Sequence, residues 1–130
     1  MQVYNKEPIQ VLWDLVKSLK SQIPIYKEIM HEEENDIPVS YILLRSQISD
    51  TVKTYGDGKG LIRSADCDII LVSKGYADDT TDLHNKNKKI IRELLKSKEI
   101  NFSESNLGYN EAIQSTEHNF SLGVNYIGQN

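Results

Sequence analysis

Residues 37–73 read IPVSYILLRSQISDTVKTYGDGKGLIRSADCDIILVS, and this stretch decides the fold. An apolar run starts at Ile37 and passes into a polar, alternating segment that ends near Tyr55. The segment 56–60, GDGKG, contains three glycines, which adopt positive φ at little cost, so we expect a turn there. A second alternating run extends from Leu61 to Ser73. Two long alternating segments around a glycine-rich turn predict an antiparallel β-hairpin.

A helix and a short strand are expected before this hairpin. Apolar residues at helical spacing predict a helix from Lys6 to Lys20, with Asn5 as its cap. The short strand runs from about Ile23 to Met30, and an acidic loop at 32–36 separates it from the hairpin. The first part of the chain therefore reads helix, strand, hairpin.

A second helix and two more strands are expected after the hairpin. The helix is predicted over about Asp79 to Lys98, with Asn87 interrupting its buried stripe of Leu83, Ile90, Ile91, Leu94 and Leu95. The tail, 101–130, is predicted to form two strands with a loop at 109–116 between them.

The order of these elements, α-β-β-β-α-β-β, predicts an α+β fold. Short connections and hairpins favour antiparallel pairing, so we expect an antiparallel or mixed sheet of about five strands. Both helices are expected to pack on one face of that sheet. The chain of 130 residues has the length of one domain, which we expect to span 1–130.

Composition excludes several classes of protein. Apolar residues make up 38% and charged residues 26%, a balance typical of a globular chain rather than a disordered one. The net charge of −4 argues against general nucleic-acid binding, which needs clustered cations. The single cysteine, Cys67, rules out an internal disulfide and favours a reducing compartment. We expect neither a signal peptide nor a membrane span.

Two aspartates supply the one pattern that suggests catalysis. Asp66 and Asp68 enter an apolar strand and share one of its faces, where two carboxylates could bind Mg²⁺. The pattern resembles the metal-binding strand of small nucleotidyltransferases. That family also holds the nucleotide phosphates with a Gly-Ser pair on a preceding strand-to-helix turn, and this chain has a hairpin loop there. Two solvent-facing aspartates at a strand entrance are the competing interpretation.

Other reactive residues suggest less. A nuclease arrangement of Asp68 with Lys74 lacks the acidic residue two positions before the lysine, where Val72 stands. Cys67 shares a strand face with apolar residues and is expected to behave as a small buried hydrophobe. His84 and His118 stand alone in the sequence, and each is expected at the surface or at a helix start.

The second helix carries a basic face. Its cations, opposite acidic loops in a net acidic chain, create a charge asymmetry that suits head-to-tail packing of subunits. The cations on or beside this face are Lys86, Lys88, Lys89, Arg92, Lys96 and Lys98. A merely solvated helix face is the alternative.

In its layout the chain resembles the tail terminator and tail-to-head joining (tail completion) proteins of long-tailed phages, the siphoviruses. The resemblance covers nearly the whole chain and rests on the order of its elements. These are an amphipathic opening helix, a short strand, a strand after an acidic loop, a long hairpin, a helix and a closing hairpin. The residues that carry it are Leu12, Trp13 and Val16, Ile25-Tyr26, residues 37–42, residues 65–69, Glu93-Leu94-Leu95, Gly108-Tyr109 and residues 118–126.

The resemblance implies structural work rather than catalysis. Such proteins form a homo-oligomeric ring, commonly a hexamer, on the end of the tail tube, where they stop tube growth and meet the head connector. Expected partners are therefore the chain itself, the tail tube protein and a head completion or connector protein. Neither a cofactor, a catalytic residue nor a metal ligand is implied. The expected location is the tail-head junction of the virion, and the host cytoplasm during assembly.

No residue-level site comes with the resemblance. The hairpin tip and the basic helix are the expected contact points, through Tyr55, Asp57, Lys59, Lys88, Arg92 and Lys96. Three hypotheses stay open: a ring-forming head-tail subunit, a small metal-dependent nucleotidyltransferase using Asp66 and Asp68, and a protein-binding module such as an immunity partner.

Overall fold

The structure confirms the α+β fold and adds one short strand to the predicted order. The computed structural model describes residues 2–29, 37–56, 60–75 and 77–128, with backbone alone at 48–56, 60–61, 77–81 and 128. The elements are β1 (Val3–Tyr4), α1 (Pro8–Val16), the 3₁₀ turn η1 (Lys17–Leu19), β2 (Ile25–Lys27), β3 (Ser40–Gly56), β4 (Gly60–Lys74), α2 (Ala77–Ser97), β5 (Ser103–Asn110) and β6 (Ser115–Gly128). The addition is β1, whose two residues are too few to give a periodic signal.

The six strands form one mixed sheet. Its order is β1-β6-β4-β3-β2. β5 pairs with the same edge of β6 as β1 does, but at the other end of that strand. The predicted hairpin is present, because β3 and β4 pair in antiparallel register from Ser40↔Ser73 to Gly56↔Gly60. The sheet is mixed, which the prediction of an antiparallel or mixed sheet allowed, because the pairs β1–β6 and β2–β3 are parallel. A parallel pair needs a long connection, and residues 28–39 provide one between β2 and β3.

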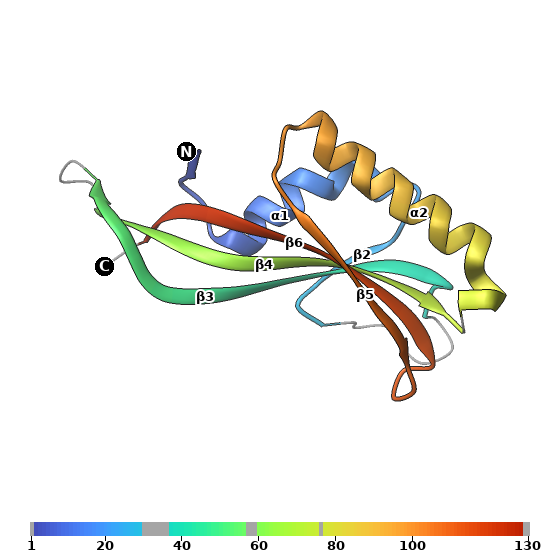
Figure 1. The fold of residues 1–130 in the computed structure, drawn as a ribbon. Helices are drawn as coiled ribbons and strands as arrows, with labels where there is room; N and C mark the ends of the chain where they lie inside the picture. Colours follow the sequence, from blue (N-terminus) through green and yellow to red (C-terminus); the bar gives the residue numbers. More distant parts are fainter. Residues whose placement is uncertain (1, 30–36, 57–59, 76, 129–130) are drawn as a thin grey trace.

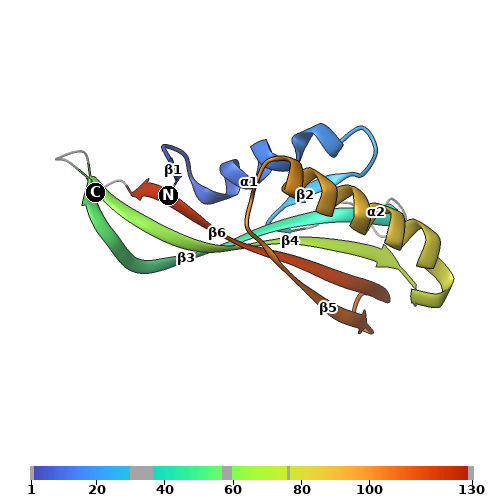
Figure 2. The same cartoon turned by 45° about the horizontal axis from the view of Figure 1, so that its top comes forward.

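Both helices cover the same face of the sheet, as predicted (Figure 1). Turned forward in Figure 2, α1 and α2 still lie on that one side of the strands. Strand side chains alternate between the two faces, so every second residue of β3, β4 and β6 faces the helices. The fully buried side chains include Leu12 of α1, Ile42, Ile69, Leu71, Ile91 of α2 and Phe120.

Several element ends differ from the predictions. The first helix begins at Pro8 rather than Lys6, and its N-cap is Glu7, which makes no side-chain cap bond; Asn5 as a cap is therefore wrong. β3 begins at Ser40, while Ile37 is 38% exposed outside the strand. β5 extends through Asn110, so only residues 111–114 form the turn of the closing hairpin. The acidic loop at 32–36 lies outside the described residues.

The buried stripe of α2 is rotated from the predicted one. Leu83 is 39% exposed, whereas His84, Asn87, Ile91 and Leu95 are buried. These four residues are three or four positions apart, so they do share one face of the helix. The rest of the predicted stripe is confirmed, since Ile91 and Leu95 are buried and Ile90 and Leu94 pack against the core. The prediction is wrong at Leu83, because it assigned apolar residues to the core first and two of the four residues that face the sheet are polar.

The β3–β4 hairpin bends between its base and its tip. Its register shifts between Ile48 and Val52 and again before Thr54. Such β-bulges increase local twist and bend a strand, and Figure 1 shows β3 curving strongly beyond the end of α1. The hairpin is therefore an arm that extends past the helical layer.

Among the described residues, no helix combines the length and apolar character that crossing a membrane requires.

Candidate functional site

The two aspartates lie on the sheet face that carries no helix. Asp66 is exposed, and Asp68 is half-buried. The Oδ1 atom of Asp68 accepts hydrogen bonds from Asn119 Nδ2 at 2.9 Å and Ser121 Oγ at 3.3 Å, both on the neighbouring strand β6. Within the described ranges, no three His, Cys, Asp or Glu side chains gather as a metal site would need. The segment before the aspartates is an antiparallel arm, not a strand-to-helix phosphate turn.

The distance between Asp68 and Lys74 excludes the nuclease arrangement. Lys74 is six residues after Asp68 on the same strand and face, which places their backbones about 20 Å apart at the usual rise of a strand. Lys74 is also exposed at the end of β4. The two side chains cannot share a substrate phosphate.

The predicted partner contacts have different outcomes. Asp57 and Lys59 lie outside the described residues, and Tyr55 is described by its backbone alone. Lys96 is exposed on α2, and Lys88 is half-buried at the flank of that helix. Arg92 is half-buried and bound within the chain, as shown below.

His84 was predicted at the surface or at a helix start, and the structure places it in the first half of α2 with its side chain buried. His84 is 4% exposed, and its Nδ1 lies 2.6 Å from Oγ of Ser73 at the end of β4. Ser73 Oγ lies 3.0 Å from Ser40 Oγ, which accepts a 3.0 Å hydrogen bond from Asn87 Nδ2. We call these four residues the polar layer. It joins the first half of α2 to the paired ends of β3 and β4.

One hydrogen bond of the polar layer has a fixed direction, because the Asn87 amide donates to Ser40. Either serine hydroxyl can be the donor between Ser40 and Ser73, and the direction between Ser73 and His84 depends on which ring nitrogen carries the proton. Burial, together with the charges of Lys88 and His118, lowers the pKa of His84 to about 4.

The polar layer is not a nucleophile site. A serine hydroxyl beside a histidine is the pair that acyl-transfer enzymes use. Here Ser73 has no exposed surface and Ser40 is 6% exposed, so a substrate cannot reach either hydroxyl. The pair contributes to packing of the helix on the sheet.

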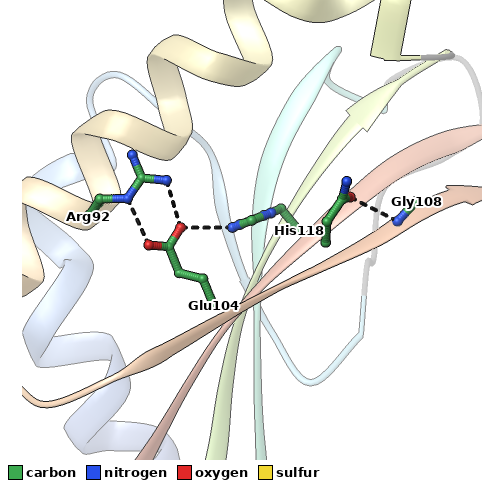
Figure 3. A network of polar contacts seen from close by, with 5 residues as sticks. Arg92, Glu104, Gly108 and His118 are labelled. Carbon is green, nitrogen blue, oxygen red and sulfur yellow. Dashed lines mark hydrogen bonds and ion pairs between the residues drawn. The ribbon is translucent and has the colours of Figure 1, made fainter.

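His118 was also predicted at the surface or at a helix start, but it lies in strand β6 and is buried. Its side chain faces the helices from β6, and its ring lies edge-on to Phe120 at 5.1 Å. Its Nε2 lies 2.9 Å from Oε1 of Glu104 on β5. Arg92 binds the same carboxylate through Nε at 2.8 Å and Nη2 at 2.7 Å. Figure 3 shows the three side chains converging from α2, β5 and β6.

We call Arg92, Glu104 and His118 the ion-pair cluster. The hydrogen bonds from Arg92 lower the pKa of Glu104 to about 2, and His118 adds to that effect. The bidentate geometry is the strong form of an Arg–carboxylate pair. The cluster ties the second half of α2 to β5, which pairs with β6 in the sheet. Nδ1 of His118 is buried without a hydrogen-bond partner.

Cys67 is buried, as predicted. Its side chain has no exposed surface, and burial raises the pKa of its thiol to about 12. A thiol with such a pKa is protonated at neutral pH and is a poor nucleophile. Cys67 therefore acts as a small apolar core residue.

The helix-free face is apolar at one end. Tyr41, Leu43, Ile70 and Val72 form a second buried cluster there, with Tyr26 packed against it. A hollow of about 360 Å³ opens over this cluster, and its walls include three exposed apolar residues. These residues are Ile29, Leu107 and Ile113. The hollow lies at the end of the hairpin strands opposite to the tip of the arm.

Sequence reasoning missed both buried polar groups. Asn87 was noted as an interruption of the apolar stripe of α2, and that interruption was the available signal. The partners of Asn87 and His84 lie far away along the chain, so no local pattern reveals them.

Comparison with family models, curated proteins and solved structures finds no significant match for this chain.

Proposed function

We propose that this chain is a structural subunit of a phage virion that assembles into a ring at the end of the tail tube, ends tube growth and joins the tail to the head connector. The proposal rests on the resemblance in layout together with one structural observation. The observation is that two contact features occupy opposite ends of the same pair of strands.

The first feature is the arm formed by β3 and β4, which extends past the helices (Figure 1). The second is the apolar hollow bordered by Ile29, Leu107 and Ile113. An apolar rim of this kind is typical of a contact surface. Different surfaces at opposite ends favour head-to-tail association, and a head-to-tail interface closes into a ring when its rotation allows. The expected partners are further copies of the chain, the tail tube protein and the connector protein.

The test is assembly on tail tubes. Wild-type protein is expected to form rings by native mass spectrometry, alone or with purified tubes, and to cap tube ends in electron micrographs. Ile113→Asp places a charge in the hollow and is expected to abolish rings and caps. Gln47→Asp is the matched control, because Gln47 is exposed on the same sheet face outside the hollow. The proposal is contradicted if the protein stays monomeric at all concentrations and does not bind the ends of tail tubes.

The enzymatic alternative gains no support from the geometry around Asp66 and Asp68. Its test is a calorimetric titration with Mg-ATP. Heat of binding that Asp68→Ala removes would replace the structural proposal with the nucleotidyltransferase one.

A further inference from the structure

The two edges of the sheet carry opposite charge. β2 forms one edge, and β5, paired with β6, forms most of the other. Residues 15–27, which end in β2, contain three lysines and no aspartate or glutamate. Residues 100–128, which contain β5 and β6, have three glutamates and no lysine or arginine. Glu104 is neutralised by Arg92, and the other two glutamates are not paired with a lysine or arginine of the described residues.

Two of the lysines converge on Trp13 of α1. The ammonium of Lys27 lies 4.9 Å from the centre of the indole ring, and that of Lys20 lies 5.4 Å from it. Within the described part of the chain, neither ammonium is paired with a carboxylate. The ring is half-buried, because it packs against the core and keeps part of its surface exposed. We call Trp13, Lys20 and Lys27 the basic corner, since an approaching carboxylate would be attracted by both cations.

The acidic surface is the end of the β5–β6 hairpin, which Figure 1 shows projecting away from the helices. Glu111 is exposed in the turn. Glu117 is half-buried on β6, where its Oε1 accepts a 3.0 Å hydrogen bond from Asn110 Nδ2. Ile113 in the same turn is 46% exposed. We call Glu111, Ile113 and Glu117 the acidic hairpin end.

The basic corner and the acidic hairpin end are chemically complementary. Each combines an apolar group, the Trp13 ring or the Ile113 side chain, with two charges of one sign. An apolar contact at the centre of an interface supplies much of its affinity, while charges at the rim set orientation and partner choice. Because the two surfaces belong to opposite edges of one sheet, they can meet only between two copies of the chain.

We propose that the acidic hairpin end of one copy docks on the basic corner of the next copy, with Ile113 against the Trp13 ring. The two glutamates then face Lys20 and Lys27. The contact is head-to-tail, because each copy at an end keeps one of the two surfaces free for a further copy. This pairing rests on the proposed self-association of the chain and names the two surfaces that meet in it. A second copy is favoured over an unrelated acidic partner, because one chain carries both halves of the contact.

Disulfide cross-linking tests the pairing under the conditions in which wild-type protein assembles, alone or on tail tubes. Ser21→Cys marks the basic corner and Ala112→Cys marks the acidic hairpin end, and both positions are exposed. After mild oxidation, a mixture of these two variants is expected to give at least about tenfold more cross-linked dimer than a control mixture, because a disulfide needs Cα atoms within about 7 Å. The control mixes Ala112→Cys with Asn85→Cys, an exposed position on α2. The native Cys67 has no exposed surface and does not compete.

The outcomes separate the pairing from the proposed function. Rings that form without this cross-link would overturn the pairing and leave the proposed function standing. Absence of rings, both in solution and on tubes, would overturn both. Cross-linking within Ser21→Cys alone or Ala112→Cys alone would indicate a symmetric contact and would also overturn the pairing.

Charge reversal provides an independent test. Lys27→Glu and Glu111→Lys are each expected to weaken association at least about tenfold, because like charges then meet at the contact. The double variant restores opposite charges between copies and should associate within about threefold of the wild type. Lys89→Glu changes an exposed cation of α2 outside the basic corner and should leave association unchanged. A double variant that associates as weakly as the single variants would contradict the pairing.

Discussion

The first and second halves of α2 lie on the same sheet but are held by different interactions. The first half presents His84 and Asn87 to a chain of hydroxyls, while the second half presents Ile91 and Leu95 to apolar strand residues. Apolar contact is non-directional and insensitive to pH, whereas a buried polar chain works only when every donor and acceptor is matched. The comparison teaches that one helix can combine a permanent attachment with a conditional one.

Truncation in the apolar half should have the largest effect. Leu95→Ala is expected to lower the free energy of unfolding by about 3 kcal/mol, because it removes a side chain with no exposed surface and leaves a cavity. Urea unfolding measures this value. Leu83→Ala is the matched control on the same helix, and its loss should be below about 1 kcal/mol since Leu83 is 39% exposed. Equal losses of unfolding free energy in the two variants would contradict the placement of Leu95 on the buried face of α2 and of Leu83 on its exposed face.

Acid should weaken the polar half next. The folded state keeps His84 neutral with a pKa near 4, and the unfolded chain binds a proton below about 6.5, so stability is lost as pH falls from 6.5 toward 4. At pH 5 the loss from this group is about 2 kcal/mol relative to pH 7. Urea unfolding at both pH values measures it. His84→Gln should remove most of the difference.

Removing one hydroxyl from the polar layer should cost less. Ser40→Ala is expected to destabilise the protein by about 1–2 kcal/mol, because it removes the acceptor of the Asn87 amide and one of the two partners of the Ser73 hydroxyl, which keeps His84. Ser105→Ala, at an exposed position of β5, is the control and should be neutral. The double variant Ser40→Ala with Asn87→Leu should lose less than the two single losses together, since both act on one network. Additive losses would argue against a connected chain.

The smallest effect is expected at the ion-pair cluster. Arg92→Ala should cost at most about 1 kcal/mol at neutral pH, because the pair is partly exposed and solvent screens it. The low pKa of Glu104, about 2, means that its contribution is present above pH 4.5 and is lost as pH falls toward 2. In an acid titration followed by circular dichroism, the unfolding transition should therefore lie at a lower pH in the wild type than in Arg92→Ala. Lys96→Ala, an exposed neighbour on α2, should behave as wild type.

Local patterns were enough for every element except the two-residue strand β1, and they failed to place residues on the correct faces of α2 and β6. The alternation in β4 correctly buried Cys67, and the predicted antiparallel pairing of β3 with β4 is confirmed. The tip of the predicted turn, residues 57–59, lies outside the described residues. The stripe of α2 was misassigned at Leu83, because hydrophobicity was used as the sign of burial. His84 and His118 were misplaced for the same reason. The predicted tip contacts Asp57 and Lys59 stay predictions.

The sequence by itself determined the order of the two helices and the five longer strands, the single long hairpin and the apolar centre, because each depends on residues a few positions apart. Tertiary structure alone decided which polar residues are buried and what they bind. Ser40 meets Asn87 47 positions later in the chain, and Asp68 meets Asn119 51 positions later. A buried hydrogen bond is favourable only when both partners arrive together, and only the folded sheet brings them there. The pairing of β3 with β4 aligns Ser40 with Ser73, and α2 then completes the layer above them.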